Sequence, residues 1–143
     1  VPMLQDGAFA LSESSAIAEY LDEVLPPPGY RALYPQPRTA RARARQLQAW
    51  LRSDLAALRD ARPTTTVFGP AAGTALTPAA ADDAARLVAC AETLLSPEAE
   101  HLFGAWSIAD TDLALMLQRL LRNGDPLPAR LVAYAEQQWR RPS

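Results

Sequence analysis

The sequence has few of the residues that build covalent cross-links or metal sites. Its 143 residues include one cysteine, Cys90, and one histidine, His101. A single cysteine excludes an intramolecular disulfide and is compatible with a reducing compartment. No cysteine, histidine or acid stands near His101 at a spacing typical of metal ligands, so we predict no metal site. Cys90 is expected to be a small buried residue of an alanine-rich helix, not a nucleophile.

Strong net charge and long apolar runs are also missing. The chain carries 14 basic residues, all of them arginine, against 16 acidic residues. This near balance gives no electrostatic reason to expect nucleic acid or an anionic membrane surface as a partner. No apolar run approaches the roughly 20 residues that span a bilayer, and the first residues lack a basic segment followed by an apolar stretch. We therefore expect a cytoplasmic protein.

Thirteen prolines outnumber six glycines, and most of the prolines are clustered. Asp6-Gly7 stands between two short apolar runs, which predicts an antiparallel hairpin with these residues in the turn. A helix is predicted from about Ser14 to Val24, because oxygen-bearing caps precede apolar residues at helical spacing. The proline-rich stretch that follows, as far as Pro37, predicts a stiff connector and a domain boundary.

The remainder of the chain has helical periodicity. The segment 39–62 contains no proline or glycine and predicts one long amphipathic helix. Its arginines Arg41, Arg45, Arg52 and Arg59 are interpreted as a solvated helix face in preference to a nucleic-acid patch. A loop is predicted over 63–78, and three further helices are predicted over about 78–95, 107–121 and 128–139.

Three motifs together resemble the bacterial glutathione S-transferase family. They are Val-Pro at 1–2, Glu-Ser-x-Ala-Ile at 13–17, and Ser-Ile-Ala-Asp at 107–110. The resemblance implies a mainly α fold: the end of a thioredoxin-like α/β domain over 1–28, a linker over 29–37, and an all-helical C-terminal domain over 38–143. The chain opens on Val1 without an initiator methionine. We therefore expect it to be part of a longer protein.

The first two motifs resemble the glutathione-binding end of the thioredoxin-like domain. In the family the proline is cis and the residue before it pairs through its backbone with glutathione, which assigns these roles to Pro2 and Val1. Glu13 and Ser14 resemble the pair that receives the γ-glutamyl end. A helix N-terminus favours the ligand's carboxylate, and Glu13 can accept hydrogen bonds from its ammonium group. The alternative interpretation is that residues 12–14 only cap a helix.

The third motif has the sequence of a capping box, in which Ser107 and Asp110 close on each other across the first helical turn. The resemblance gives this box a structural role at the start of the central helix of the second domain. Trp50 and the loop around Phe68 are the expected lining of an apolar second-substrate pocket by family analogy. The competing interpretation places these aromatic residues in the core or at the domain interface.

The resemblance implies conjugation of reduced glutathione, as co-substrate, to a hydrophobic electrophile, with glutathione peroxidase activity on peroxides as a further family activity. Such activities belong to detoxification and the response to oxidative stress. The family's activating Ser, Tyr or Cys lies near the first strand and helix of the thioredoxin-like domain, so no catalytic residue is assigned within this sequence. The family also implies a homodimer. The alternative is a non-catalytic binding or protein-interaction module on the same fold.

Overall fold

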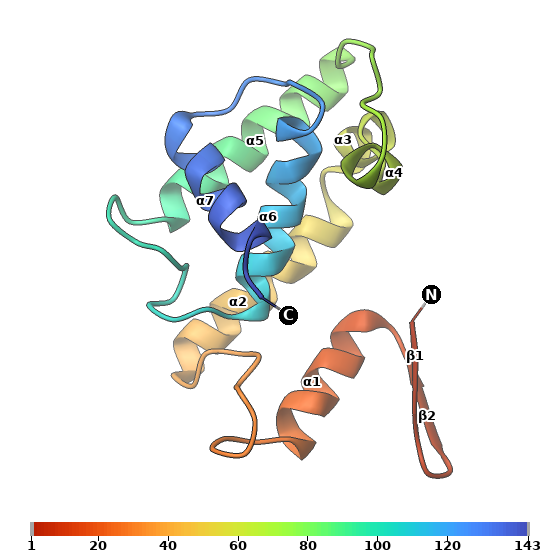
Figure 1. Ribbon diagram of the computed structural model, residues 1–143, viewed down its shortest axis with the longest axis vertical. Coiled ribbons are helices and arrows are strands. Elements are labelled where there is room, and N and C mark those ends of the chain that lie inside the picture. The colour runs from red at the N-terminus through yellow and green to blue at the C-terminus, as the bar shows by residue number, and fades with distance from the viewer. Residues whose placement is uncertain (1, 143) are drawn as a thin grey trace.

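The computed structural model describes residues 2–142, which form a hairpin and a helix followed by a helical bundle (Figure 1). Strands β1 (Met3–Asp6) and β2 (Phe9–Ser12) pair antiparallel, and helix α1 (Ser14–Val24) follows directly. The predicted hairpin and first helix are thus confirmed. The turn differs by one residue: Asp6 ends β1, and the connection is Gly7-Ala8, where Gly7 has a φ of 58° that glycine adopts without strain.

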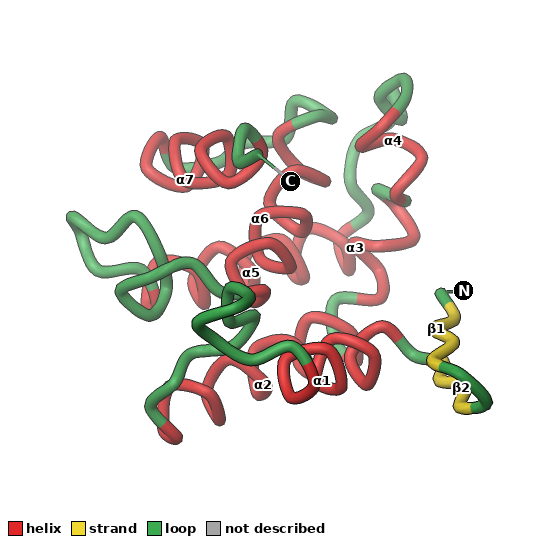
Figure 2. The backbone as a smooth tube through the Cα atoms, turned by 60° about the horizontal axis from the view of Figure 1, so that its bottom comes forward, coloured by secondary structure: helices red, strands yellow, loops and turns green. Residues whose placement is uncertain are grey.

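Helix α6 lies at the centre of the bundle, as Figures 1 and 2 show. Its leucines at 113, 117 and 120 are almost fully buried, which explains why its sequence is apolar nearly all round. The mainly α fold class is confirmed, as are the three predicted helices after residue 78. The bundle consists of α2 (Arg38–Ser53), α3 (Ala56–Ala61), α4 (Thr64–Phe68), α5 (Pro78–Leu94), α6 (Ile108–Leu121) and α7 (Ala129–Trp139).

The single long helix predicted over 39–62 is wrong, because the chain breaks between α2 and α3 at Asp54 and Leu55. Leu55 has left-handed backbone angles, φ 34° and ψ 31°. Arg59 donates from Nη1 to the carbonyl oxygens of Leu51 and Asp54, both at 2.9 Å. Asp83 of α5 accepts from the amide of Leu58 at 3.1 Å. These tertiary partners satisfy the backbone groups that the break releases, so it needs neither proline nor glycine.

The loop predicted over 63–78 is partly wrong as well, because Thr64–Phe68 forms the short helix α4. Pro63 precedes the helix, a position where its missing amide costs no hydrogen bond. Arg119 of α6 reaches this corner, where it donates to the carbonyl oxygen of Arg62 at 2.6 Å and to the hydroxyl of Thr64 at 3.1 Å. None of the helices within residues 2–142 combines the length and hydropathy needed to cross a bilayer.

Candidate functional site

The start of α1 carries two polar side chains that are free to meet a ligand. Glu13 is the N-cap residue and Ser14 is the first residue of the helix, and both are exposed. Neither side chain makes a hydrogen bond within residues 2–142, so the Glu13 carboxylate does not cap α1. The first helical bond joins the amide of Ile17 to the carbonyl oxygen of Glu13 at 2.9 Å. The amides of the first turn therefore point outward at the positive end of the helix.

The backbone of Glu13 is in a strained conformation, with φ 73° and ψ 115°. Positive φ is uncommon for a residue other than glycine, and such strained residues are concentrated at functional sites. This conformation turns the chain sharply between β2 and α1. Glu13 is therefore the corner residue that connects the two elements and belongs to neither. Glu13 was predicted from the resemblance of the motif at 13–17; its backbone angles are an independent reason to place a site here.

The hairpin register brings Pro2 to the same corner. Met3 pairs with Ser12, so Pro2, which precedes β1, lies at the same end of the hairpin as Glu13. Pro2 is exposed. Val1, and with it the isomer of the Val1–Pro2 bond, lies outside the described residues. Three of the four predicted glutathione contacts, Pro2, Glu13 and Ser14, are therefore at one end of the hairpin.

Tyr20 fixes the hairpin against α1. Its hydroxyl donates to the Asp6 carboxylate at 2.7 Å, and its ring packs on Phe9 with centroids 5.3 Å apart. The hydrogen bond to Asp6 raises the pKa of the Tyr20 phenol. The sequence predicted only a turn role for Asp6. Its hydrogen bond with Tyr20 joins residues fourteen positions apart, which leaves no local signal in the sequence.

Two ion pairs set the direction of α1 along α2. Arg41 pairs with Asp22 at 2.7 Å and Arg45 pairs with Glu19 at 2.5 Å. The paired positions rise from 41 to 45 along α2 and fall from 22 to 19 along α1. The two helices therefore run antiparallel (Figure 1). The N-terminal end of α1, with Glu13 and Ser14, consequently points toward the C-terminal half of α2. Arg45 is exposed, as a solvated helix face predicts, whereas Arg41 is only partly exposed. The sequence did not predict that both arginines pair with acids of α1.

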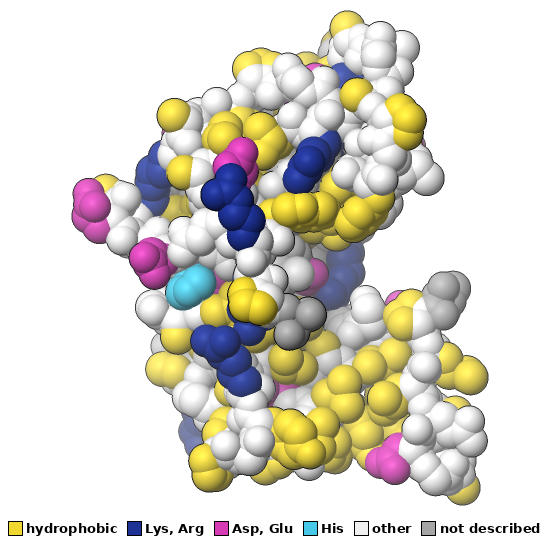
Figure 3. Space-filling view, viewed as in Figure 1, with side chains coloured by type: hydrophobic (Ala, Val, Ile, Leu, Met, Phe, Trp, Pro, Cys, Tyr) yellow, Lys and Arg dark blue, Asp and Glu magenta, His cyan; other side chains and the backbone are white. Residues whose placement is uncertain are grey.

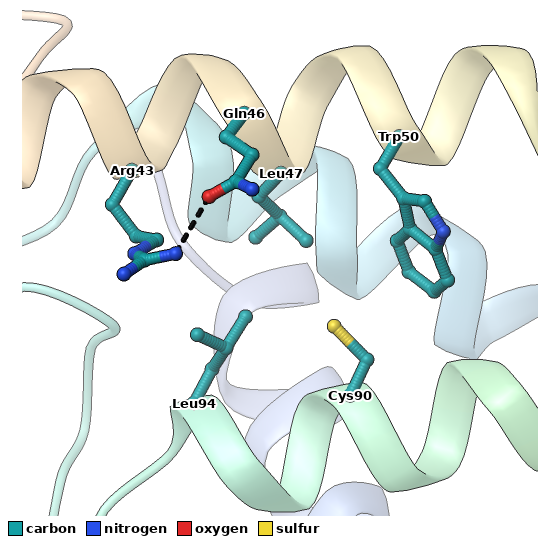
Figure 4. A pocket seen from close by; sticks show the side chains of 6 residues that line it. All are labelled: Arg43, Gln46, Leu47, Trp50, Cys90 and Leu94. Carbon is teal, nitrogen blue, oxygen red and sulfur yellow. Dashed lines mark hydrogen bonds between the residues drawn. The ribbon is translucent and has the colours of Figure 1, made fainter.

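A hollow of about 360 Å³ lies between α2 and α5 and contains Trp50. In Figure 4, Trp50 extends from α2 and Cys90 from α5 toward the space between the two helices, with Leu47 and Leu94 alongside. Burial raises the pKa of the Cys90 thiol, so the thiolate is disfavoured there. Trp50 lies roughly half a helical turn away from the stripe that carries Arg41 and Arg45. It therefore faces away from α1.

Phe68 lies elsewhere, on α4. It is 68% exposed, and its ring stacks on Trp139 of α7 with centroids 5.4 Å apart. The guanidinium group of Arg122 lies over the Trp139 ring, 5.1 Å from the ring centroid. The structure thus does not bring Trp50 and Phe68 into one pocket; the first belongs to the α2–α5 hollow and the second to a surface aromatic pair.

A second hollow, of about 240 Å³, continues the α1-facing stripe of α2 and is called here the arginine hollow. Its lining residues are Gln48, Leu51, Arg52, Arg59, Asp112, Leu115, Met116 and Arg119. In Figure 3, basic and acidic side chains are visible on the floor of the cleft between the hairpin-bearing part and the upper helices. The sequence gives no local signal for this hollow, because three helices assemble it and it has no motif of its own.

Asp112 is the acidic member of the arginine hollow. It accepts from Gln48 at 2.7 Å and from Arg52 at 3.3 Å. Burial raises the pKa of the Asp112 carboxyl, and Gln48 and Arg52 oppose that effect. Within residues 2–142 no group of three or more His, Cys, Asp or Glu side chains is arranged to hold a metal ion.

Ser107 and Asp110 form the predicted capping box at the start of α6. The Asp110 carboxylate is fully buried and accepts from the Ser107 amide at 2.9 Å and the Ser107 hydroxyl at 3.1 Å. It also accepts from the Leu102 amide at 2.8 Å and the Tyr134 hydroxyl at 2.9 Å. Burial and the Asp110 charge raise the pKa of the Tyr134 phenol. The box is therefore the centre of a network joining α6 to α7.

The family described as "Glutathione S-transferase, C-terminal domain" matches residues 38–143. The chain belongs to the glutathione S-transferase family. A solved structure of a glutathione transferase homolog from Burkholderia gl BGR1, with bound glutathione, is 48% identical, with a TM-score of 0.79. The match covers 99% of this chain and 67% of that one. The search of curated proteins found no match.

Family membership confirms the resemblance inferred from the motifs. It also assigns the two parts of the fold: α2 to α7 make up the helical C-terminal domain of the transferases, and the hairpin with α1 matches the end of their thioredoxin-like domain.

Proposed function

We propose that this protein is a glutathione transferase that conjugates reduced glutathione to hydrophobic electrophiles, with peroxides as further substrates. Val1, Pro2, Glu13 and Ser14 bind glutathione in this proposal. The observation that carries it is the corner at the start of α1, where Glu13 has a strained backbone and an exposed carboxylate with no partner among the described residues.

The chemistry of this corner matches the γ-glutamyl end of the tripeptide. The α-carboxylate of that end suits the free amides of the first turn and the Ser14 hydroxyl. Its ammonium group suits the Glu13 carboxylate, since charge-assisted hydrogen bonds are the stronger ones. The glutathione bound to the 48% identical homolog supports the choice of ligand.

Catalysis then consists of favouring the glutathione thiolate, which attacks the electrophile and displaces its leaving group. The residue that activates the thiol is assigned, by family analogy, to the thioredoxin-like domain and not to residues of this sequence. A role in detoxification and oxidative stress, a homodimeric assembly and a cytoplasmic location belong to the same proposal.

Retention on glutathione-agarose and turnover of 1-chloro-2,4-dinitrobenzene and cumene hydroperoxide test the proposal on the complete protein, which in this proposal includes the residue that activates the thiol. We expect retention, together with thioether formation from the aryl chloride. Retention without turnover would favour the alternative, a non-catalytic binding or interaction module. Absence of both would contradict the assignment of glutathione as ligand.

A further inference from the structure

His101 and Gln138 connect the loop 95–107 to helix α7. Nε2 of Gln138 lies 3.2 Å from Nδ1 of His101, and it also donates to the carbonyl oxygen of Glu100 at 2.9 Å. Gln138 is buried, with 8% of the residue exposed. Because of this burial, solvent cannot readily replace either contact. The pair of contacts is called here the His101–Gln138 joint.

The carbonyl group of Glu100 fixes the orientation of the Gln138 amide. A carbonyl oxygen can only accept a hydrogen bond, so the amino group of the amide, and not its oxygen, must face Glu100. The same amino group then faces His101. Since it can only donate, Nδ1 of the ring has to be the acceptor, and a ring nitrogen accepts only when it carries no proton. The joint therefore requires the neutral ring, with its proton on the other ring nitrogen.

Protonation of His101 removes one of the two contacts. The charged ring carries a hydrogen on Nδ1, which then points at the hydrogens of the Gln138 amino group. Turning the amide over brings its oxygen to the ring and restores that contact, but it places the same oxygen against the carbonyl oxygen of Glu100. Either orientation loses one partner, so the charged ring weakens the attachment of the loop to α7.

The loop continues from His101 into the network around Asp110. The next amide, that of Leu102, donates to the buried Asp110 carboxylate at 2.8 Å, and Ser107 at the end of the loop belongs to the capping box. The ring of His101 is half-buried and reaches the surface, where it is the one cyan side chain in Figure 3. Protons therefore have access to a residue whose neighbour contacts the start of α6.

Charged groups surround the joint, but none of the ion pairs within residues 2–142 includes His101. On α7, Glu136 pairs with Arg140. On α6, Asp110 accepts from four donors. The other charged or titratable side chains on the elements that meet here are Glu98, Glu100, Arg130 and Tyr134, together with Arg31 and Arg141 over the Trp106 ring. Histidine is the one side-chain type whose ordinary pKa lies between pH 5 and 8, so a change within this range acts on the joint through His101.

We propose that the His101–Gln138 joint is a pH-sensitive switch, in which the neutral ring holds the loop 95–107 against α7 and the charged ring releases it. Release also loosens the contact between Leu102 and Asp110 at the start of α6. The loop is thus attached near pH 8 and is released as the pH falls and His101 gains its proton. This switch does not rest on the proposed transferase function.

Nuclear magnetic resonance on the complete, isotope-labelled protein tests the switch. We expect the ring nitrogens of His101, assigned by the loss of their signals in His101→Asn, to show at pH 8 a neutral ring without a proton on Nδ1. Between pH 8 and pH 5.5 the ring should gain its proton. The hydrogen-exchange protection factor of the Leu102 amide should then fall roughly two- to tenfold, the factor that the loss of one ordinary hydrogen bond gives.

Three results on the parent protein would overturn the proposal. The first is a proton on Nδ1 at pH 8, because the contact with Gln138 would then not be the one described. The second is a ring that stays neutral down to pH 5.5. The third is a ring that becomes charged while the protection factor of the Leu102 amide does not change.

Two variants separate the switch from a general effect of acid. In His101→Asn the side-chain oxygen can replace Nδ1 as an acceptor at every pH, so the Leu102 protection factor should agree within about twofold at pH 8 and pH 5.5. In Gln138→Glu a carboxylate faces the ring and accepts from the charged form, so protection should instead rise on acidification. A fall in His101→Asn equal to that of the parent would overturn the proposal. Circular dichroism checks that each variant is folded, and if Gln138→Glu is not, the parent and His101→Asn decide.

Discussion

Asp22 of α1 and Arg41 of α2 join the N-terminal hairpin and helix to the helical domain. Their side chains meet at 2.7 Å, and that of Asp22 is only 3% exposed. The second oxygen of Asp22 accepts from the amides of Leu33 and Tyr34, at 2.6 and 3.4 Å. One carboxylate therefore holds the end of α1, the connector and α2 together, and it sets the direction in which Glu13 and Ser14 point.

Replacing Asp22 by alanine should loosen this joint. We expect a loss of roughly 2–4 kcal/mol in the free energy of unfolding, because the change leaves buried donors without an acceptor. Urea denaturation measures it. Glu19→Ala is the matched control, since its pair with Arg45 is more exposed and should contribute less than about 1 kcal/mol. Equal losses in the two variants would contradict the special role of Asp22.

Replacing Asp110 by alanine should cost roughly 3–5 kcal/mol, because four donors then lose their buried acceptor. Ser107→Ala removes one hydroxyl from the same box and should cost about 0.5–2 kcal/mol. Thermal or urea unfolding followed by circular dichroism gives both values. A loss at Asp110 no larger than that at Ser107 would mean that the carboxylate serves only the cap and does not join α6 to α7.

Asp83 should make stability depend on pH in the acid range. Burial alone would raise the pKa of its carboxyl, but the hydrogen bonds from Arg86 and the Leu58 amide outweigh burial, and the pKa is lowered. A pKa that is lower in the folded state contributes stability above the usual aspartate value of about 3.9 and loses it as the pH falls toward the lowered value.

The difference in unfolding free energy between the parent and Asp83→Asn should thus have its full value at pH 7 and decrease below about pH 4. Asp82→Asn, at the neighbouring exposed position of α5, should change stability by less than about 0.5 kcal/mol throughout. Urea titrations between pH 3 and 7 measure both. A difference for Asp83→Asn that grows on acidification would contradict the sign.

The sequence-based expectation that Trp50 and Phe68 line one second-substrate pocket can be tested by the coupling between the two residues. The two residues occur in separate surroundings: Trp50 lines the α2–α5 hollow, and Phe68 stacks on Trp139. We therefore expect the effects of Trp50→Ala and Phe68→Ala on kcat/KM to add within about 0.5 kcal/mol in the double variant. An interaction energy above about 1 kcal/mol would show that they share one pocket after all.

Local patterns in the sequence predicted the elements whose signals are local. Asp-Gly at 6–7 predicted the hairpin, and Ser-Ile-Ala-Asp at 107–110 predicted the box that starts α6. The break at Leu55 could not be predicted, because Arg59 and Asp83 compensate for it and Asp83 lies on another helix. Phe68 was assigned to a loop for a related reason: a five-residue helix leaves little periodicity to detect.

The same difference between local and long-range signals applies to the candidate site. Glu13 and Ser14 were predicted because they form one contiguous motif at the start of a helix. The arginine hollow was not predicted, because Arg59 and Arg119 are sixty positions apart in the sequence and only the folded structure brings them together. Trp50 was expected to line a second-substrate pocket, but the face of α2 that meets α1 is the opposite one, as the ion pairs with Asp22 and Glu19 show.

The most direct test of the account is calorimetric titration of reduced glutathione into the purified protein and into the double variant Glu13→Gln, Ser14→Ala. We predict measurable binding by the parent and a loss of affinity of at least roughly tenfold in the double variant, with an unchanged circular dichroism spectrum. Undiminished glutathione affinity in a folded double variant would contradict the assignment of the α1 corner as the glutathione site.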